Sequence, residues 1–436
     1  MSVQHEAASE TPTGKEPAGL NRGQWLVLIA AFLGWMFDGV ELGLFSGVAR
    51  PVLLGLLGLP DEKTSDAIIV PWISFLMASF LLGAACGGVF FGWLGDRIGR
   101  VRAMALSILA YSLFTGLCCL ATSPWQLGVL RFLAALGMGG EWSLGVALVV
   151  ECWPERLRPL LSGGIGATGN VGYLMIGLLV RWYPPTPDHW RWIMVACATP
   201  AVLALFIVLW IPESKRWRQS VRRTGPGPLQ EILTTRLIRP TLLAIGLASV
   251  ALIGTWGCVQ AFLPSWAGQL AGREIPNAGG TALVCVSIGA MLGGLLGPLV
   301  GGKIGRRPAY FAICLGSLVT CQLLYYTFDA YNNQFLLMAG IVGCFTAAFY
   351  GWLPLYLPEL FPTRVRATGQ GLSYNFGRIF AMFGVLVAGQ LPQWFKVAGQ
   401  EHLTYPRTCA TISLIYVVGM VLIWFAPETK GKPLPD

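Results

Sequence analysis

Long apolar stretches separated by short polar segments recur along the whole chain. A helix needs roughly 20 predominantly apolar residues to cross about 30 Å of hydrocarbon, and twelve such stretches can be placed in this sequence. The pattern therefore predicts an all-α membrane protein with twelve transmembrane helices. The predicted spans are residues 24–48, 68–93, 103–122, 125–150, 160–182, 190–211, 241–266, 280–301, 309–328, 334–357, 367–391 and 408–426.

The composition supports the same class of protein. Of the 436 residues, 55% are hydrophobic and only 12% are charged, whereas a soluble domain carries about 25% charged residues. Residues 1–23 are polar and lack the order of a cleavable signal, so we expect the first helix to direct insertion. The 11 cysteines lie mostly inside apolar spans, which favours packing between helices over disulfide formation.

Lys and Arg are distributed unevenly between the two sets of loops. If the N-terminus is inside, the tails and the even-numbered junctions hold 21 of the 30 basic residues, the opposite loops hold seven, and the spans hold Arg131 and Arg378. This bias predicts that both termini are cytoplasmic. The net charge of +9 does not indicate a nucleic-acid partner, because the basic residues do not gather on one amphipathic face.

Short motifs recur at a nearly constant distance. ECWPERLR at 151–158 and ELFPTRVR at 359–366 share one spacing at an offset of 208, and GDRIGR at 95–100 recurs as GGKIGR at 301–306 at an offset of 206. PESK, beginning at Pro212, also recurs as PETK. Three pairs in the same order indicate an internal repeat. Two halves with the same direction of travel leave a central cavity between them, which predicts alternating access.

The repeat predicts two pseudo-symmetric six-helix bundles. A basic hydrophilic segment divides the chain after the sixth span. The predicted parts are an N-terminal tail at 1–23, an N-terminal bundle at 24–211, a cytoplasmic linker at 212–240, a C-terminal bundle at 241–426 and a tail at 427–436.

Three segments resemble signatures of the major facilitator superfamily. They are GWLGDRIGRVR at 92–102, RFLAALGMGGE at 131–141 and PELFPTRVRATGQG at 358–371, and the resemblance extends from residue 25 to residue 432. Within the superfamily, FDGVE at 37–41 together with GGE at 139–141 looks most like the metabolite and proton symporters, including aromatic-acid and sialic-acid carriers.

Details of this resemblance distinguish between aromatic-acid carriers, sugar porters and drug antiporters of the superfamily. Asp38 and Glu41 fit the acidic pair in helix 1 of aromatic-acid carriers, with Glu replacing the second Asp, and residues 377–379 match their G-R-I triplet. Sugar porters share the helix 1 spacing at Glu41, but the paired Gln expected in helix 7 is the single Gln260. The helix 5 segment lacks the proline expected of drug antiporters, which favours import.

Five charged residues fall inside predicted spans, where an ionised group costs roughly 2.5–3.5 kcal/mol. Asp38 and Glu41 lie three apart on one helical face. Two such carboxylates do not readily ionise together, so we predict that this pair carries a proton; the alternative is that they cap polar groups or pair with a basic residue. Glu141 is a candidate for proton relay, substrate contact or helix-to-helix hydrogen bonding. The resemblance implies a coupling role for Arg131, with an interhelical salt bridge as the alternative.

Arg378 is a charge present in only one half, because Asn170 occupies the corresponding position at an offset of 208. A guanidinium offers a fork of donors that suits a carboxylate, so we predict that Arg378 binds an anionic substrate; pairing with an acid elsewhere is the alternative. The other predicted substrate-binding residues are polar or aromatic and lie deep in the spans. They are Asn375, Tyr374, Trp142, Asn170, Tyr173, Trp256, Gln260, Tyr350 and Trp352.

The charged residues of the repeated loop motifs lie at the predicted cytoplasmic ends of the helices. We predict that they pair across helices when the inner side is closed and separate when it opens. The arginines among them also serve as topology determinants. The predicted gate residues are Asp96, Arg97, Arg100, Glu151, Arg156, Glu359 and Arg364.

Motifs of other function classes are missing. The sequence has no Walker sequence and no metal-spaced Cys or His cluster, and its three histidines lie outside the spans. We therefore expect no cofactor and no metal, with the proton gradient as the energy source. The sequence predicts a monomeric, proton-coupled importer of a small organic anion, such as an aromatic acid or sialic acid, in the plasma (inner) membrane. The alternatives are a sugar or polyol porter and a transport-dead sensor or intramembrane enzyme.

Overall fold

The computed structural model describes residues 21–59, 66–183, 185–221, 227–260, 262–272, 275, 278–394 and 404–435. Almost all of these residues are helical. Eleven helical stretches are long and apolar enough to cross a membrane, and α15 (Arg366–Trp394) is the remaining long helix. The predicted all-α membrane fold is confirmed. Most of the N-terminal tail predicted at 1–23 lies outside the described residues.

The first half of the chain supplies six spans. The sixth is divided in two, because Pro200 has no N–H to continue the ladder of hydrogen bonds. The helices are α1 (Arg22–Leu57), α2 (Asp66–Ile98), α3 (Arg100–Leu117), α4 (Pro124–Cys152), α5 (Arg158–Trp182), and α6 (Arg191–Ala196) followed by α7 (Ala201–Trp210).

Two short helices, α8 (Lys215–Val221) and α9 (Pro228–Ile232), lie in the linker. The second half then repeats the pattern with two more divided spans. It consists of α10 (Ile238–Gly254), a π-helical segment (Thr255–Gln260) and α11 (Leu263–Ala271), then α12 (Ala278–Ile304), α13 (Arg306–Thr327), α14 (Asn333–Tyr356), α15, and α16 (Thr404–Ser413) followed by α17 (Ile415–Leu422).

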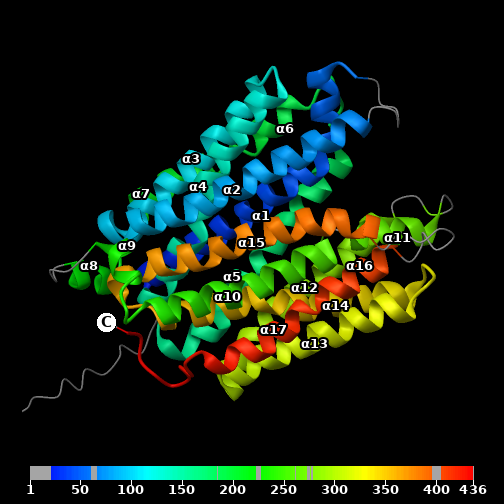
Figure 1. Ribbon diagram of the computed structural model, residues 1–436. Coiled ribbons are helices and arrows are strands. Elements are labelled where there is room, and N and C mark those ends of the chain that lie inside the picture. Colours follow the sequence, from blue (N-terminus) through cyan, green and yellow to red (C-terminus); the bar gives the residue numbers. More distant parts are fainter. Residues whose placement is uncertain are drawn as a thin grey trace, which may run out of the picture.

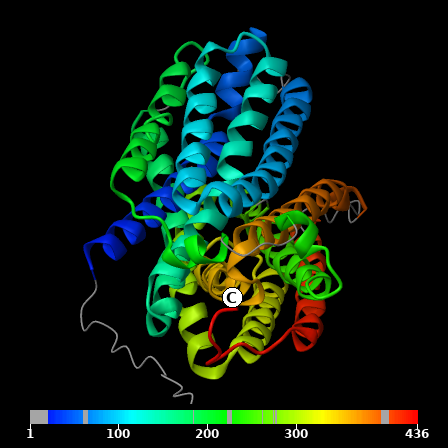
Figure 2. The ribbon, with the colours of Figure 1, turned by 90° about the vertical axis from the view of Figure 1, so that its left-hand side faces the viewer.

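The two halves pack internally in the same way. In the first half α2 packs on α4 and α1 on α5; in the second half α12 packs on α14 and α10 on α15. Between the halves, α2 packs against α15, which we call the first seam, and α5 packs against α12 and α14, the second seam. Figure 2, viewed along the bundle, shows the two groups of helices one above the other.

Glycines at repeated positions allow the close helix contacts. A Cβ atom added at Gly87 would lie 1.8 Å from the carbonyl oxygen of Leu136, and one added at Gly293 would lie 1.8 Å from that of Cys344. Gly99 and Gly305, in the repeated loop motifs, both have a positive φ, of 110° and 108°, which side chains with a Cβ rarely adopt. The repeat seen in the sequence is therefore a repeat of backbone geometry.

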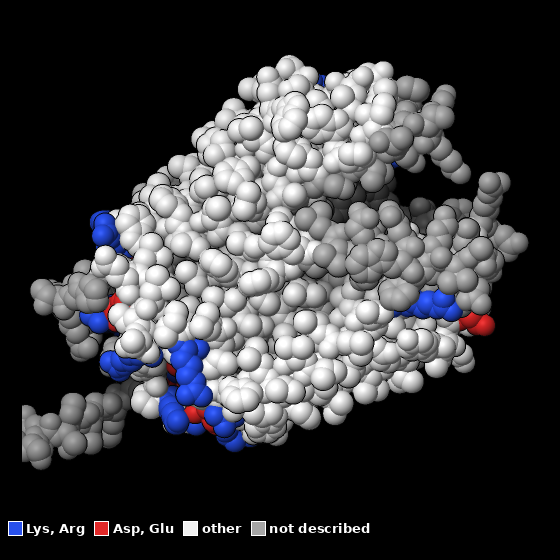
Figure 3. Space-filling view, in the orientation of Figure 1, with Lys and Arg blue, Asp and Glu red and all other residues white. Residues whose placement is uncertain are grey.

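Charged side chains gather at the two ends of the molecule. Figure 3 shows Lys, Arg, Asp and Glu at the left and right ends, with a wide uncharged surface between them. Large apolar side chains of the membrane-spanning helices, such as Leu106, Leu205 and Leu292, are exposed. A surface of this kind is stable against hydrocarbon and not against water.

Among the described residues, the two halves pack together toward one end of the molecule. We call the end that carries α8, α9 and the C-terminal tail the linker end, and the opposite end the far end; Figure 1 shows the linker end at the left. One cluster of buried apolar residues contains members of both halves. A second cluster, between Leu44 and Cys197 at the far end, contains described residues of the first half alone. The halves are therefore closed together toward the linker end.

Candidate functional site

A cavity lies between the halves in the middle of the bundle. Its volume is about 70 Å³, and roughly 10–15 Å³ suffices for one water molecule, so it can hold several waters. α1, α2 and α5 form the wall from the first half, and α10 with its π-helical segment, α14 and α15 form the other wall. The lining residues are Trp35, Gly39, Leu42, Phe80, Leu81, Ala84, Gly166, Gly169, Asn170, Tyr173, Leu252, Trp256, Gln260, Tyr350, Tyr374 and Arg378.

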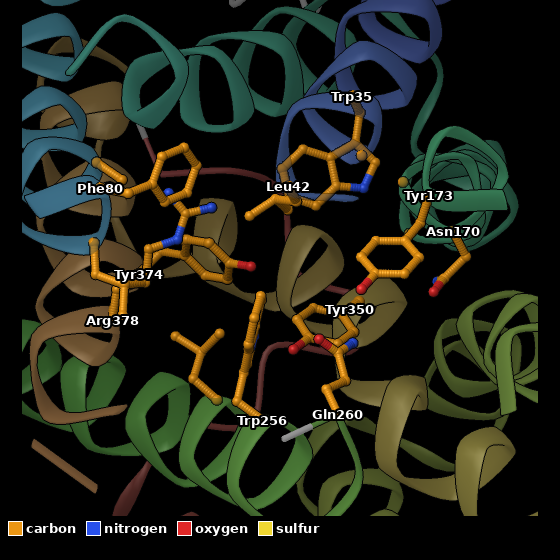
Figure 4. A pocket seen from close by; sticks show the side chains of 16 residues that line it. Trp35, Leu42, Phe80, Asn170, Tyr173, Trp256, Gln260, Tyr350, Tyr374 and Arg378 are labelled. Atoms are coloured by element: carbon orange, nitrogen blue, oxygen red, sulfur yellow. The ribbon is translucent and has the colours of Figure 1, made fainter. Parts of the chain in front are cut away.

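Arg378 brings a positive charge to this cavity. Its guanidinium lies 5.0 Å from the centre of the Tyr374 ring, and Nη1 donates a hydrogen bond of 3.0 Å to Oδ1 of Asn375. Figure 4 shows the group between Phe80 and Tyr374, with the polar groups of Asn170 and Gln260 at the other side of the cavity. The cavity thus has a cationic end, an amide end and aromatic walls.

The π-helical segment places two of the predicted binding residues. Trp256 and Gln260 both line the cavity from it, and the Thr255 hydroxyl donates to the carbonyl of Thr346 on α14 (2.7 Å). Single π turns inside α-helices occur frequently at functional sites. The sequence predicted a membrane-spanning helix over 241–266, and within this span the structure winds Thr255–Gln260 as a π-helix where it meets the cavity.

Asp38 and Glu141 form a buried pair of carboxyl groups next to the cavity. Each residue is 1% exposed, and the two side chains contact each other between α1 and α4. None of their four carboxyl oxygens accepts a hydrogen bond from a donor in the described part of the chain. Arg378 is the neighbouring opposite charge of Asp38. Two carboxylates this close repel each other when both are charged, and a proton on one of them removes this repulsion.

Glu41 is engaged elsewhere. Its Oε1 accepts a hydrogen bond from Nη1 of Arg131 in a salt bridge between α1 and α4, and both side chains are 1% exposed. Arg131 also lies over the ring of Phe80, at 4.6 Å from its centre. We expected Asp38 and Glu41 to face each other. In the structure the partner of Asp38 is Glu141, and the alternative of an interhelical salt bridge holds for Arg131.

Three predicted substrate-binding residues do not line the cavity. Trp142 stacks on Tyr374 at 4.2 Å between ring centres and so lies behind it. Trp352 is fully buried against Tyr310 and Tyr356 in the core of the second half.

Asn375 is the third, and it is fully buried. Its Nδ2 donates to the carbonyl of Gly139 (3.3 Å) and to that of Gly371 (2.8 Å). It therefore faces α4 across the seam and not the cavity.

The sequence analysis missed Trp35, Leu42 and Phe80 as lining residues. Phe80 and Leu42 are indistinguishable in sequence from lipid-facing side chains. Trp35, three residues before Asp38, was the one with a usable signal, because it shares the helical face of that acid.

The predicted gate residue Asp96 ties α2 to the beginning of α15 at the linker end. Its carboxylate accepts hydrogen bonds from the backbone N–H groups of Ala367 (3.3 Å) and Thr368 (2.8 Å) and from the Thr368 hydroxyl (2.5 Å). A helix N-terminus favours a negative charge at this place. Thr368 was not predicted.

Arg100 and Glu151 complete this connection across the first seam. Arg100 donates to Asp96 (2.5 Å), to Glu151 (3.1 Å) and to the carbonyl of Thr363 (2.7 Å). Glu151 also accepts from Arg366 of the second half (3.1 Å). Arg100, Glu151 and Arg366 are each buried. We call Asp96, Arg100, Glu151, Arg366 and Thr368 the first-seam lock.

The other predicted gate residues are placed differently. Glu359 pairs with Arg306 inside the second half (2.6 Å), and Arg364 pairs with Glu231 of the linker (2.6 Å). Arg97 is exposed above the ring of Trp93. Arg156 is also exposed and lies outside the first-seam lock.

The repeated PES and PET motifs hold the beginnings of α3 and α13. Glu213 accepts from the backbone N–H groups of Arg100 and Val101, and Glu428 accepts from those of Arg306 and Arg307. Burial raises the pKa of the Glu213 carboxyl. At Glu428 burial acts in the same direction, but backbone N–H donors outweigh it and hold the pKa of the carboxyl below its usual value.

A family model described as Major Facilitator Superfamily matches residues 25–385. This chain belongs to the Major Facilitator Superfamily. It is 28% identical over 425 residues to a putative metabolite transport protein of Haemophilus influenzae, with 95% of this chain and 99% of that protein covered. It is 30% identical over 378 residues to the cis,cis-muconate transport protein of Acinetobacter baylyi, with coverage of 84% and 87%.

Among solved structures, the proton:xylose symporter XylE bound to 6-bromo-6-deoxy-D-glucose has a TM-score of 0.75 at 17% identity, covering 94% of this chain and 98% of that one. This likeness shows the fold. Membership of the superfamily, together with the similarity to metabolite transport proteins, makes this chain an integral membrane transporter of metabolites and not an enzyme. Among its described residues, no three His, Cys, Asp or Glu side chains are placed to hold a metal ion.

The buried Glu41–Arg131 salt bridge yields a stability prediction. Glu41→Gln removes the carboxylate of a buried salt bridge and should lower the free energy of unfolding by about 3–5 kcal/mol. Thermal unfolding of the purified protein measures this loss, and Glu41→Gln combined with Arg131→Gln should recover part of it. The control is Glu231→Gln. Its partner Arg364 is 33% exposed, so this variant should lose at most about 1 kcal/mol of the free energy of unfolding. Equal losses in both single variants would contradict the prediction.

Proposed function

We propose that this transporter is a proton-coupled importer of a small organic anion that works by alternating access. The observation that carries the proposal is the position of Arg378, which lines the central cavity and is also the neighbouring opposite charge of Asp38 in the Asp38–Glu141 pair. One guanidinium is thus available to a substrate carboxylate and to the candidate proton carrier.

The cavity suits an anion with a flat apolar body. A carboxylate can take the fork of donors on Arg378, while Trp256, Tyr350 and Tyr374 offer ring faces to an unsaturated or aromatic skeleton. Muconate, after which a relative that is 30% identical is named, is such a carboxylate. This similarity supports an aromatic acid or another small carboxylate, sialic acid included, as the substrate class.

Coupling follows from competition for Arg378. Without substrate, the guanidinium favours a negative charge on Asp38. A substrate carboxylate bound to Arg378 neutralises that influence, so Asp38 and Glu141 then hold a proton more firmly. Proton and anion therefore enter together, and neither carboxyl group stays charged without a partner in the closed protein. Glu41 and Arg131 hold α1 and α4 in register around this pair.

Alternating access requires the linker end to open after binding. We infer that the linker end is cytoplasmic, with both termini in the cytoplasm of a cell whose plasma membrane holds the protein as a monomer. The bundles at 24–211 and 241–426 then move as units joined by the linker at 212–240. The first-seam lock holds the inner side closed, and its charges separate when that side opens to water.

A second candidate is a proton-coupled sugar or polyol porter. The amide end of the cavity favours it, because Asn170, Gln260 and the Tyr173 hydroxyl suit substrate hydroxyl groups. In this case Arg378 would act only as the opposite charge of Asp38 and would not bind the substrate.

Uptake into proteoliposomes with an imposed pH gradient tests the two candidates. Labelled muconate, benzoate, sialic acid and a hexose are offered to the wild type and to Arg378→Gln. We expect a carboxylate to accumulate in vesicles that carry the wild type, and Arg378→Gln to raise the KM for that carboxylate at least about tenfold. The reason is that the variant loses a charge-assisted hydrogen bond worth roughly 1.5–3 kcal/mol. Accumulation of the hexose alone would overturn the anion proposal.

The role of Asp38 as a proton carrier can be tested separately. Asp38→Asn removes a titratable group but keeps the size of the side chain, so accumulation driven by the pH gradient should be abolished while counterflow exchange is retained to a larger extent. Both rates are measured in the same vesicles. Equal loss of the two would assign Asp38 to binding or folding instead.

Asn375 is a positioning residue for Arg378. It connects Nη1 of Arg378 to the Gly139 carbonyl on α4, and a Cβ added at Gly88 on α2 would lie 1.7 Å from its Nδ2. Opening of the first seam withdraws Asn375 from α2 and α4 and so releases Arg378, which favours inward release of the anion.

Asn375→Asp places a carboxylate against Arg378 and competes with the substrate. The variant should raise the KM for the anion more than it lowers the maximal uptake rate. Ser373→Ala is the control, since Ser373 is buried on the same helix and its hydroxyl has no hydrogen-bond partner in the described part of the chain. An unchanged KM for the anion in Asn375→Asp would contradict the role of Asn375 as a positioning residue for Arg378.

A further inference from the structure

The two seams carry the same motifs but not the same charges. Asp96 corresponds to Gly302 at an offset of 206, and Arg366 corresponds to Arg158 at an offset of 208. At the first seam the Asp96 carboxylate caps α15 and Glu151 binds Arg366. At the second seam position 302 has no side chain to contribute a carboxylate. A negative charge that the first half supplies is therefore missing from the second.

A basic pocket lies at the place of the missing charge. Its volume is about 330 Å³, and both halves and the C-terminal tail form its walls. Five cationic side chains and two carboxylates line it, which leaves an excess of three positive charges (five minus two). The lining residues are Glu155, Arg156, Arg158, Pro159, Gly302, Arg306, Glu359, Lys430, Gly431 and Lys432.

Both carboxylates of the basic pocket are already occupied. Glu155 accepts from Arg158 (2.9 Å), and Glu359 accepts from Arg306 (2.6 Å) and from the Thr429 hydroxyl (2.5 Å). They leave the exposed side chains of Arg156, Lys430 and Lys432 without a carboxylate partner in the pocket, and Nζ of Lys430 donates to the Lys303 carbonyl (2.6 Å). An anion from outside the chain would balance these charges.

Arg158, a buried residue in the wall of the basic pocket, supports the same conclusion. It is only 4% exposed, and its Nε has no hydrogen-bond partner among the described residues. A buried donor of a charged group that is left unsatisfied costs free energy. At the first seam the corresponding Arg366 has its Nε bound to the Pro358 carbonyl (3.2 Å), so the two equivalent arginines differ in this donor.

The surroundings of the basic pocket are apolar. Leu160, next to Pro159, is 52% exposed, and Ile304, between Gly302 and Arg306, is 51% exposed. Both lie at the ends of membrane-spanning helices. An amphipathic ligand can place a charged head in the pocket and its chains along these side chains. Basic pockets between transmembrane helices are suited to acidic lipid headgroups.

We propose that the basic pocket at the second seam binds the phosphate group of an anionic phospholipid. The phosphate takes the place that Asp96 occupies at the first seam and satisfies Arg158. Because the pocket is built from both halves and the tail, a lipid bound there stabilises the conformation in which the linker end is closed. The proposal is independent of the identity of the transported substrate.

The test uses the full-length protein in nanodiscs of phosphatidylcholine with and without phosphatidylglycerol. Thermal unfolding is followed by Trp fluorescence, and bound phosphatidylglycerol is counted by native mass spectrometry. The test variant combines Arg156→Gln with Lys432→Gln. The control combines Arg97→Gln with Arg102→Gln, which removes two exposed charges from the linker end outside the pocket.

We expect phosphatidylglycerol to raise the unfolding temperature of the wild type and of the control variant. The test variant should lose more than half of that rise and retain less bound lipid. Equal loss in both variants would mean general attraction of a basic surface for acidic lipid, and would overturn the proposal. An equal rise with inorganic phosphate in detergent would also overturn it, because the pocket would then be a site for free phosphate.

A second variant keeps the test informative if charge removal impairs folding. Gly302→Asp together with Pro159→Ala copies the first seam into the second, since Ala367 corresponds to Pro159 and a Cβ at Gly302 alone would lie 2.9 Å from the proline ring. This protein should be stable in pure phosphatidylcholine and should respond little to phosphatidylglycerol. An undiminished response would count against the proposal.

Discussion

The structure depends on the rule that a charge removed from water needs a partner. Arg100, Glu151 and Arg366 are buried together with Asp96 where the two halves meet. Removing one partner from such a group leaves an uncompensated buried charge, which costs several kcal/mol. The seam is therefore stable when all four groups are paired or when water reaches all of them, and half-open arrangements are disfavoured. A two-state junction of this kind is the element that alternating access requires.

α15 connects this junction to the cavity. The same helix carries Arg366 and Thr368 in the first-seam lock and, further along, Tyr374 and Arg378 in the wall of the cavity. A helix is stiff over this length, so movement of its beginning away from α2 displaces the residues that line the cavity. Arg378 in the cavity wall and the first-seam lock thus share one rigid element.

The pseudo-symmetry of the two halves extends further in their packing than in their charges. Glycines at repeated positions bring the helices together in both halves, and the Arg100–Glu151 and Arg306–Glu359 pairs repeat. The carboxyl groups of Asp38, Glu41, Glu141 and Asp96 and the guanidinium of Arg378 each occur in one half alone. Packing needs the same shapes twice, whereas binding and coupling need different groups facing each other across the cavity. The basic pocket at the second seam is a further consequence of this difference in charge between the halves.

The sequence by itself determined the number of spans, the repeat and the residues whose charge had to be compensated, because hydrophobic length and charge burial are properties of local segments. It also named seven of the cavity residues, among them Arg378, Tyr374 and Gln260. Only the tertiary structure decided the partners. Asp38 faces Glu141 and not Glu41, and Asn375 faces α4 and not the cavity, because the rotation of each helix about its axis is fixed by packing against its neighbours. Residues 103 positions apart cannot be paired from sequence spacing alone, and that distance separates Asp38 from Glu141.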